Sequence, residues 1–255
     1  MAAHRAPAVV PLSIGLGLGV ALLSGLVPAS PPGAAPAGSL RPAMLVWAVG
    51  LDQREGPSRL VETITAATWS GRPVWRVTHT PQDPSASKTR DFDLYDLDRD
   101  TLAPLRSVST HDDGTLALEF NRERVVVRKS GTGGGDVEEV ELHGPVEPEG
   151  PGLTPFVATL PLSDGYLRRY DMVDRWDGRG SARLKRITLR ATRRGDTTSA
   201  LGRNAIFEVA IQPEDSGFRI VEEVLAKGLH WPVRMTYTRG ALTLKSEVLS
   251  IASSP

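Results

Sequence analysis

Residues 231–238 read Trp-Pro-Val-Arg-Met-Thr-Tyr-Thr, an alternation of large apolar and polar side chains. Successive side chains of a β-strand point to opposite faces, so Val233, Met235 and Tyr237 would share one face. A period of two with one apolar face is typical of a half-buried strand in an antiparallel sheet. Arg239-Gly240 follows as a turn signal, and a further strand is predicted over 241–251.

The same period recurs along the chain. Leu116, Leu118 and Phe120 alternate with small or polar residues, and so do Ile187, Leu189 and Ala191. Less regular strands are predicted at 59–69, 73–80, 91–98, 104–110, 124–129, 137–142, 204–212 and 217–226. Asp-Gly and Gly turns separate these segments and supply the positive φ of tight hairpins. We therefore predict an all-β fold with minor helix, an antiparallel meander forming a curved open or half-barrel.

The stretch 166–177 fits two periods. Tyr166, Tyr170 and Val173 follow helical spacing, whereas Tyr166, Tyr170 and Trp176 also follow strand spacing. Asp164-Gly165 favours a hairpin, so we predict a strand. A short helix near 153–160 is compatible with the sequence, although Pro155 and Pro161 limit it.

The N-terminus has the layout of a secretory signal peptide. Arg5 precedes an apolar run, Leu12 to Leu26, and small residues follow. We predict cleavage after Ala29, with Ala37 as the second candidate site. The alternative is an uncleaved anchor, which would need roughly 20 apolar residues and would have to include prolines and glycines.

These features divide the chain into three parts. Residues 1–29 are predicted to be the signal peptide, 30–43 a flexible Pro/Ala/Gly linker and 44–253 a single β-rich domain. We expect a protein that is exported, either periplasmic or secreted, with no stable membrane span after cleavage.

Composition excludes several classes of function. Lysine plus arginine and aspartate plus glutamate number 30 each, so no net charge attracts nucleic acid. The chain has no cysteine, which excludes disulfides, thiolate metal sites and a lipid-modified cysteine at the cleavage site. We therefore expect no nucleic-acid partner.

No motif predicts catalysis. Asp96, Asp98 and Asp100 resemble the start of a calcium loop, but Thr101 and Ser107 stand where the loop needs Gly and Glu. An Asp-rich turn that bonds its own backbone is the favoured interpretation. The histidines lack metal-ligand spacing, and no nucleophile elbow or phosphate-binding loop occurs. We predict no catalytic residue, no metal and no cofactor.

Paired carboxylates do not change this conclusion. Glu222 and Glu223 are neighbours in a predicted strand, so they should face opposite sides, and both are expected to be solvated. Four aromatic residues are speculative ligand-binding candidates, because amphipathic rings can line a small-molecule site: Phe156, Tyr166, Tyr170 and Trp176. Packing in the core is the favoured alternative for them.

Three segments together resemble a known group of proteins. Asp91–Arg106 reads as a strand, a D-x-x-T-x-x-P turn and a returning strand; Thr159–Gly165 and the strand Trp231–Tyr237 follow later. Over about 58–251 the chain is similar to exported half-barrel domains of unknown function related to the lipoprotein carriers LolA and LolB. The resemblance implies a curved sheet with an apolar concave face, which carriers use to hold acyl chains and cover with helices. This sequence has no clear amphipathic helix, and no family ligand residue matches.

The expected function is the binding of a hydrophobic or lipid-like ligand in the cell envelope, without catalysis. A curved sheet with one apolar face must cover it with a helix, a partner or a ligand. The alternative is a structural or protein-interaction module of the envelope, which would bind another envelope protein. A hydrolytic enzyme is the least favoured alternative.

Overall fold

A computed structural model describes residues 39–51, 58–82, 92–112, 114–131, 135–174, 182–215 and 217–253. All of them fall in one compact unit, Pro32–Pro255. The predicted cleavage sites and Trp176 lie outside the described residues. No helix in the described part of the chain is long and apolar enough to cross a membrane.

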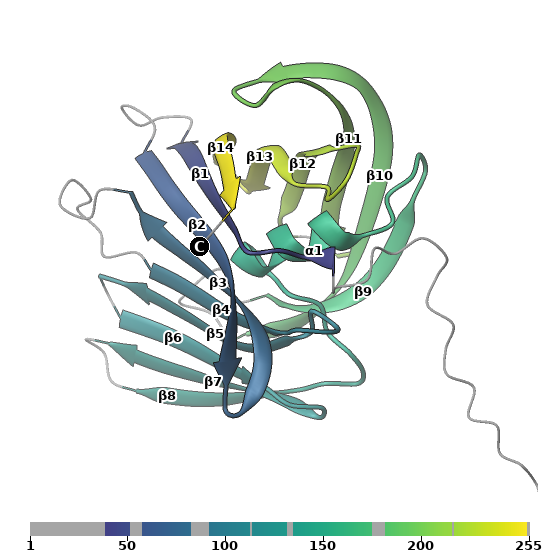
Figure 1. The fold of residues 1–255 in the computed structure, drawn as a ribbon. Coiled ribbons are helices and arrows are strands. Elements are labelled where there is room, and N and C mark those ends of the chain that lie inside the picture. Colours follow the sequence, from purple (N-terminus) through teal and green to yellow (C-terminus); the bar gives the residue numbers. More distant parts are fainter. Residues whose placement is uncertain are drawn as a thin grey trace, which may run out of the picture. The chain divides into compact units, whose positions relative to one another are not determined.

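In the described ranges, fourteen strands form one antiparallel sheet that curves around a short α-helix (Figure 1). The sheet is open, as the sequence predicts. The strands are β1 (Ala43–Leu51), β2 (Ser58–Trp69), β3 (Arg72–Pro81), β4 (Phe92–Asp98), β5 (Pro104–His111), β6 (Gly114–Phe120), β7 (Arg124–Gly131), β8 (Asp136–Glu141), β9 (Leu167–Asp174), β10 (Arg183–Ser199), β11 (Gly202–Pro213), β12 (Arg219–Leu225), β13 (Pro232–Arg239) and β14 (Leu242–Ser253).

The sheet consists of two meanders joined in the middle. Strands β1 to β8 form one and β9 to β14 form the other, and β1 pairs with β14, from Ala43 opposite Ser253 to Leu51 opposite Leu244. This pairing uses both ends of the folded sequence. Leu40 and Ala43, which fall in the range of the predicted linker, are buried here.

Strands β8 and β9 are the two free edges of the sheet, and side chains near these edges pack together. Val173 of β9 and Leu184 of β10 belong to one cluster with Leu118 of β6 and Val127 of β7. Beside β9, the amide of Glu147 donates to the carbonyl of Asp171 at 2.8 Å. The edges therefore approach through apolar contacts, without a shared ladder of backbone hydrogen bonds.

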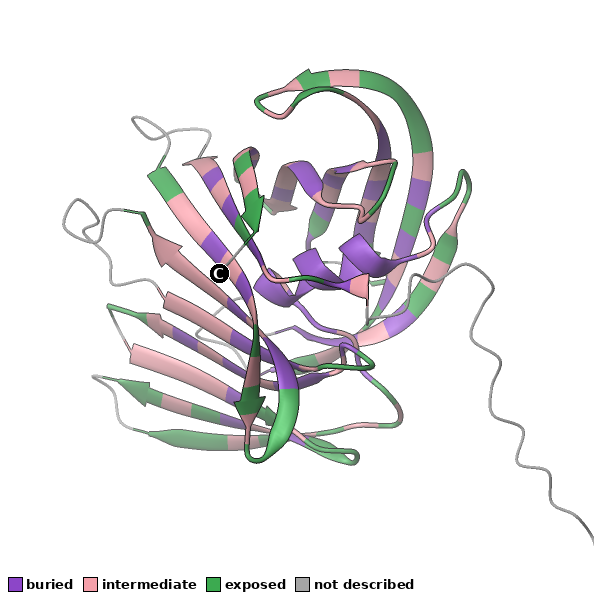
Figure 2. Cartoon of the chain, viewed as in Figure 1, coloured by how far each residue is buried: buried purple, intermediate pink, exposed green. Residues whose placement is uncertain are grey.

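The chain that links β8 to β9 crosses the concave side of the sheet. It contains the 3-10 helix η2 (Gly150–Gly152) and the helix α1 (Leu153–Thr159), every residue of which is buried (Figure 2). Because α1 is buried on all sides, with Thr154 and Thr159 included, it has no solvated polar face and no amphipathic pattern, so the sequence does not reveal it as a covering helix. Pro155 is tolerated because it lies in the first turn, where backbone N–H groups have no helical partner.

Two local predictions are confirmed. The stretch after Tyr166 is a strand, β9, and Tyr170 and Met172 share its buried face. In the Asp-rich turn, Asp98 Oδ1 accepts hydrogen bonds from the amides of Asp100 at 3.2 Å and Thr101 at 3.1 Å. Asp98 therefore caps a turn, as the favoured interpretation requires.

Candidate functional site

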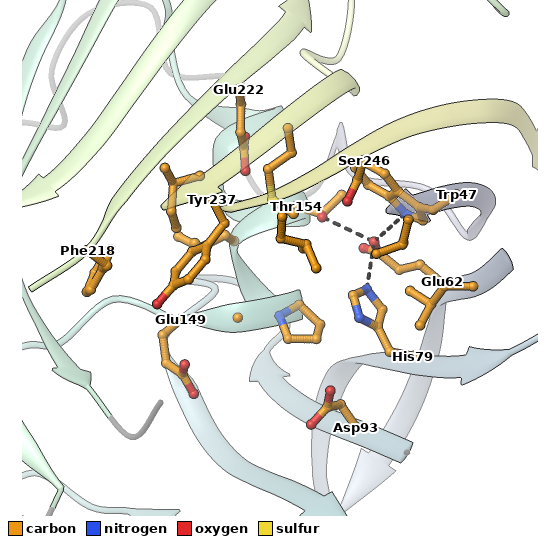
Figure 3. Close-up of a pocket in the computed structure, with 18 of the residues that line it drawn as sticks. Trp47, Glu62, His79, Asp93, Glu149, Thr154, Phe218, Glu222, Tyr237 and Ser246 are labelled. Carbon is orange, nitrogen blue, oxygen red and sulfur yellow. Dashed lines mark hydrogen bonds and ion pairs between the residues drawn. The ribbon is translucent and has the colours of Figure 1, made fainter. Parts of the chain in front are cut away.

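A cavity of about 220 Å³ lies between the concave face of the sheet and the segment that carries η2 and α1 (Figure 3). Apolar side chains make up much of its wall: Trp47, Val49, Leu60, Leu153, Met172, Phe218, Ile220, Met235 and Leu244. Phe218 directly precedes β12, and the others come from inward-facing positions of β1, β2, β9, β12, β13 and β14 and from α1. Alternation in the strands therefore creates an apolar chamber under the helix.

Glu62 on β2 lies at one side of the cavity and is fully buried. Its Oε2 atom accepts hydrogen bonds from Trp47 Nε1 at 3.0 Å and from Thr154 Oγ1 at 3.2 Å, and His79 Nε2 lies 2.9 Å away. These contacts converge on one oxygen and join α1 to the sheet. The other oxygen, Oε1, has no hydrogen-bond partner within the described part of the chain.

A second polar group lies across the cavity. Glu222 on β12 and Ser246 on β14 both pair in register with Met235 on β13, so all three side chains share the concave face. Glu222 and Ser246 are only 4% and 6% exposed. Glu222 Oε2 and Ser246 Oγ have no partner among the described residues. A buried polar atom without a partner costs about 1–3 kcal/mol, so such atoms indicate a place where a ligand or water binds.

Burial changes the protonation of two carboxyl groups in the wall. It raises the pKa of Glu222 to about 8, and the nearby Glu62 adds to this effect. Burial also raises the pKa of Glu149 well above its usual range, with further contributions from Asp93 and Asp174. Tyr95 donates a hydrogen bond to Glu149 Oε1 at 2.8 Å. At neutral pH, most Glu222 carboxyl groups are therefore protonated, and burial favours the protonated form of Glu149 in the same direction.

The ionisable groups of the wall are mostly acidic. Five carboxyl residues line the cavity: Glu62, Asp93, Glu149, Asp174 and Glu222. His79 is the one potentially cationic side chain among the described lining residues, and no lysine or arginine is among them. Arg239 lies near the rim, where its Nη1 atom is 3.5 Å from Asp174 Oδ1. Such a wall favours a neutral or cationic guest over an anion.

Two specific arrangements, a metal cluster and an activated serine, are not found among the described residues of this site. No group of three or more histidine, cysteine or acidic residues in the described ranges could hold a metal ion. Ser246 Oγ has no hydrogen-bond partner there and therefore lacks the adjacent base that activates a serine nucleophile.

The aromatic candidates from the sequence lie elsewhere. Phe156 and Tyr170 are buried in the core cluster of α1 and β9–β12, with their rings edge to face at 5.5 Å, and Tyr166 packs against the same cluster. None of these three lines the cavity, and Trp176 lies outside the described residues. Their role in ligand binding stays a prediction.

Sequence reasoning did not identify the acidic residues that line the cavity. Glu222, expected to be solvated, is buried because its strand alternates Ile220, Glu222 and Val224 toward the concave face. Glu62 likewise alternates with Leu60 and Ile64 on the inward face of β2. An acidic residue at an inward position of an apolar alternation is the signal that could have found both.

No protein-family model matches the chain, and no curated protein matches its sequence. Its fold is similar to the crystal structure of a β-barrel-like protein of the domain of unknown function DUF1849 from Brucella abortus. The TM-score is 0.52 at 13% sequence identity, and the match covers 85% of this chain and 99% of the other. This likeness supports a β-barrel-like domain and concerns the fold alone.

Proposed function

We propose that this protein binds a small hydrophobic or lipid-like molecule in the cavity between its curved sheet and α1. One observation carries the proposal: an apolar chamber of about 220 Å³ has buried polar atoms in its wall that lack partners within the described part of the chain. Ligand sites in proteins are typically apolar and contain a few convergent polar groups.

The size of the cavity limits the guest. An engineered apolar cavity of about 150 Å³ binds benzene, whereas sites for drug-sized ligands measure about 300–1,000 Å³. The chamber here falls between these values. It suits one short chain or ring, and is too small for the several acyl chains of a lipoprotein.

An export role is part of the proposal. The signal-like segment before Ala29 and the expected relation to the LolA/LolB carriers both suggest a protein of the cell envelope. N-terminal sequencing of the chain from its host cells would test this. We expect a mature N-terminus at Ser30 or Gly38, and a protein that begins at Met1 would contradict export with cleavage.

The interaction alternative has less support. The large hydrophobic side chains exposed among the described residues lie on different strands: Met44, Val137, Leu167 and Leu242. Scattered single residues do not form the contiguous patch that marks a protein interface.

Calorimetric titration of the purified chain with octanol tests the binding proposal. We expect saturable binding at one site. Leu244→Trp, which fills the cavity, should weaken binding at least tenfold. Leu242→Trp is the matched control, because the same change on the same strand falls at a residue that is 41% exposed and outside the cavity wall. Absence of octanol binding, or equal effects of the two variants, would refute the proposal.

A further inference from the structure

We propose that the cavity is selective for a small amine with an apolar body, whose protonated amino group binds Glu222, Glu62 Oε1 and Ser246 Oγ. This inference rests on the proposed function, since it names the chemical class of the ligand that the cavity would hold.

The first argument is the set of polar atoms without partners. Glu62 Oε1, Glu222 Oε2 and Ser246 Oγ are buried in the same wall and accept no hydrogen bond from the described residues. Figure 3 shows both carboxyl groups directed toward the middle of the lining residues, that of Glu222 from above and that of Glu62 from the right. An ionised carboxylate only accepts hydrogen bonds, and a hydroxyl oxygen can accept them as well, so a cationic donor satisfies all three atoms once Glu222 is ionised.

The second argument is the spacing of these atoms. Glu222 and Ser246 are separated by one strand, β13, so their Cα atoms lie about 10 Å apart across two strand spacings. Both side chains extend from the concave face, and Met235 lies between them in the register. An ammonium group has three donors in a compact head, which matches three acceptors that come from different strands.

The third argument is the sign of the charge. The described lining residues include five carboxyl groups and neither lysine nor arginine. The contacts of Glu62 Oε2 with Trp47, Thr154 and His79 hold that carboxyl group in place and leave Oε1 for a guest. A fatty acid would bring its carboxylate to this wall and would be repelled. An alcohol could bind but would gain no ion pair.

Burial keeps most Glu222 carboxyl groups protonated near neutral pH in the empty protein. When an alkylammonium ion binds, Glu222 loses its proton to solvent and becomes the counter-ion, while the amine keeps its own proton. Glu222 therefore stays mostly uncharged while the cavity is empty and becomes charged when a cation binds. This avoids the large cost of a buried charge without a partner.

Titrations of the purified chain with octylamine, octanol and octanoate at about pH 8 test the inference. The three probes share one chain length and differ in the charge of the head group. We expect octylamine to bind about ten- to a hundredfold more tightly than octanol, the range that a charge-assisted hydrogen bond supplies, and octanoate to bind most weakly.

The variant Glu222→Gln should remove the advantage of octylamine, so that octylamine and octanol bind this variant with similar affinity. Glu223→Gln is the matched control, because Glu223 is the next residue of β12, faces the other side and pairs with Arg234 at 3.2 Å. It should leave both affinities unchanged. If Glu222→Gln proves unfolded by thermal melting, Ser246→Ala gives the same test and should lower octylamine affinity several-fold.

The outcomes separate the two proposals. Equal binding of all three probes, with no effect of Glu222→Gln or Ser246→Ala on octylamine, overturns amine recognition and leaves the proposed binding function intact. Tighter binding of octanoate than of octylamine also overturns amine recognition. Failure of all three probes to bind overturns the binding function and the amine inference together.

Discussion

Glu62 and Glu222 lie in the wall of one cavity, on strands β2 and β12, close enough for their carboxyl groups to interact. Three strands, β1, β14 and β13, lie between β2 and β12 in the sheet. In the sequence, 159 residues lie between Glu62 and Glu222. Burial, with the added repulsion from Glu62, raises the pKa of Glu222 to about 8. Glu62 therefore affects the ionisation of Glu222, although the two residues are far apart in the chain.

Stability should fall as pH rises because of Glu222. Its ordinary pKa is 4.5 and its folded pKa is about 8. Below 4.5 both states hold the proton; between these values the unfolded chain releases it while the folded protein retains it. The free energy of unfolding should therefore decrease by about 1.4 kcal/mol per pH unit from this group, and level off above about pH 8.

Urea unfolding of the wild type and Glu222→Gln at several pH values measures this effect. The variant should lose this part of the pH dependence and become the more stable protein at pH 8. Glu223→Gln should keep the wild-type slope, since Glu223 lies on the opposite face. Parallel curves for the wild type and Glu222→Gln would contradict the assignment.

Binding of octylamine should strengthen as pH rises from about 6 to 8. One proton leaves Glu222 on binding, so the affinity should increase by up to tenfold per pH unit, while an alkylamine stays protonated to about pH 10. Octanol binding should be much less dependent on pH. The other titratable groups that line the cavity are Glu62, His79, Asp93, Glu149, Asp174 and Tyr237. A slope that persists in Glu222→Gln would assign the proton to one of those groups.

Removal of Arg76 should destabilise the sheet. Its guanidinium group donates to both oxygens of Asp96, at 2.7 and 3.0 Å, and Asp96 is fully buried. Arg76→Ala leaves that carboxylate without its partner, and we expect a loss of about 3 kcal/mol in unfolding free energy. Arg72→Ala, on the same strand, removes an exposed pair with Asp98 and should cost at most about 1 kcal/mol. Equal losses in urea unfolding would contradict this ranking.

Gly152 allows η2 to pass close to the sheet. A Cβ atom at this position would lie 2.7 Å from Pro148 Cβ and 3.4 Å from a ring atom of Tyr95. Gly152→Ala should therefore cost about 1–3 kcal/mol, the usual effect of overpacking. Gly144→Ala, in the same connection but with nothing within 4 Å, should change stability by less than about 1 kcal/mol. Thermal unfolding of both variants distinguishes these outcomes.

Phe156 should matter for stability more than for binding. Its ring is 3% exposed, contacts Tyr170 edge to face and is outside the cavity wall. Phe156→Ala should cost about 3–5 kcal/mol. The milder Phe156→Leu should fold and bind octanol as the wild type does. Loss of octanol binding in folded Phe156→Leu would support the ligand contact predicted from the sequence.

Much of the sheet could be predicted because strand alternation is a local property. The inward residues Val233, Met235 and Tyr237 follow from the period of two, and the turn at Asp98 follows from its side-chain chemistry. Strand β1 was missed, because Ala43–Leu51 is an almost continuous apolar run without that period. Its pairing with β14 joins the two ends of the folded sequence, and no local pattern encodes that contact.

The sequence by itself determined most of the strands, their turns and the alternation of side chains along each of them. Only the tertiary structure decided that Glu62, Glu222 and Ser246 share one cavity and that α1 is buried on every side. The physical reason is that alternation specifies the direction of a side chain relative to its own strand. Curvature of the sheet and the path of the β8–β9 connection depend on contacts between residues far apart in the chain. Those contacts bring the inward acids together and give a buried carboxyl group a pKa of about 8.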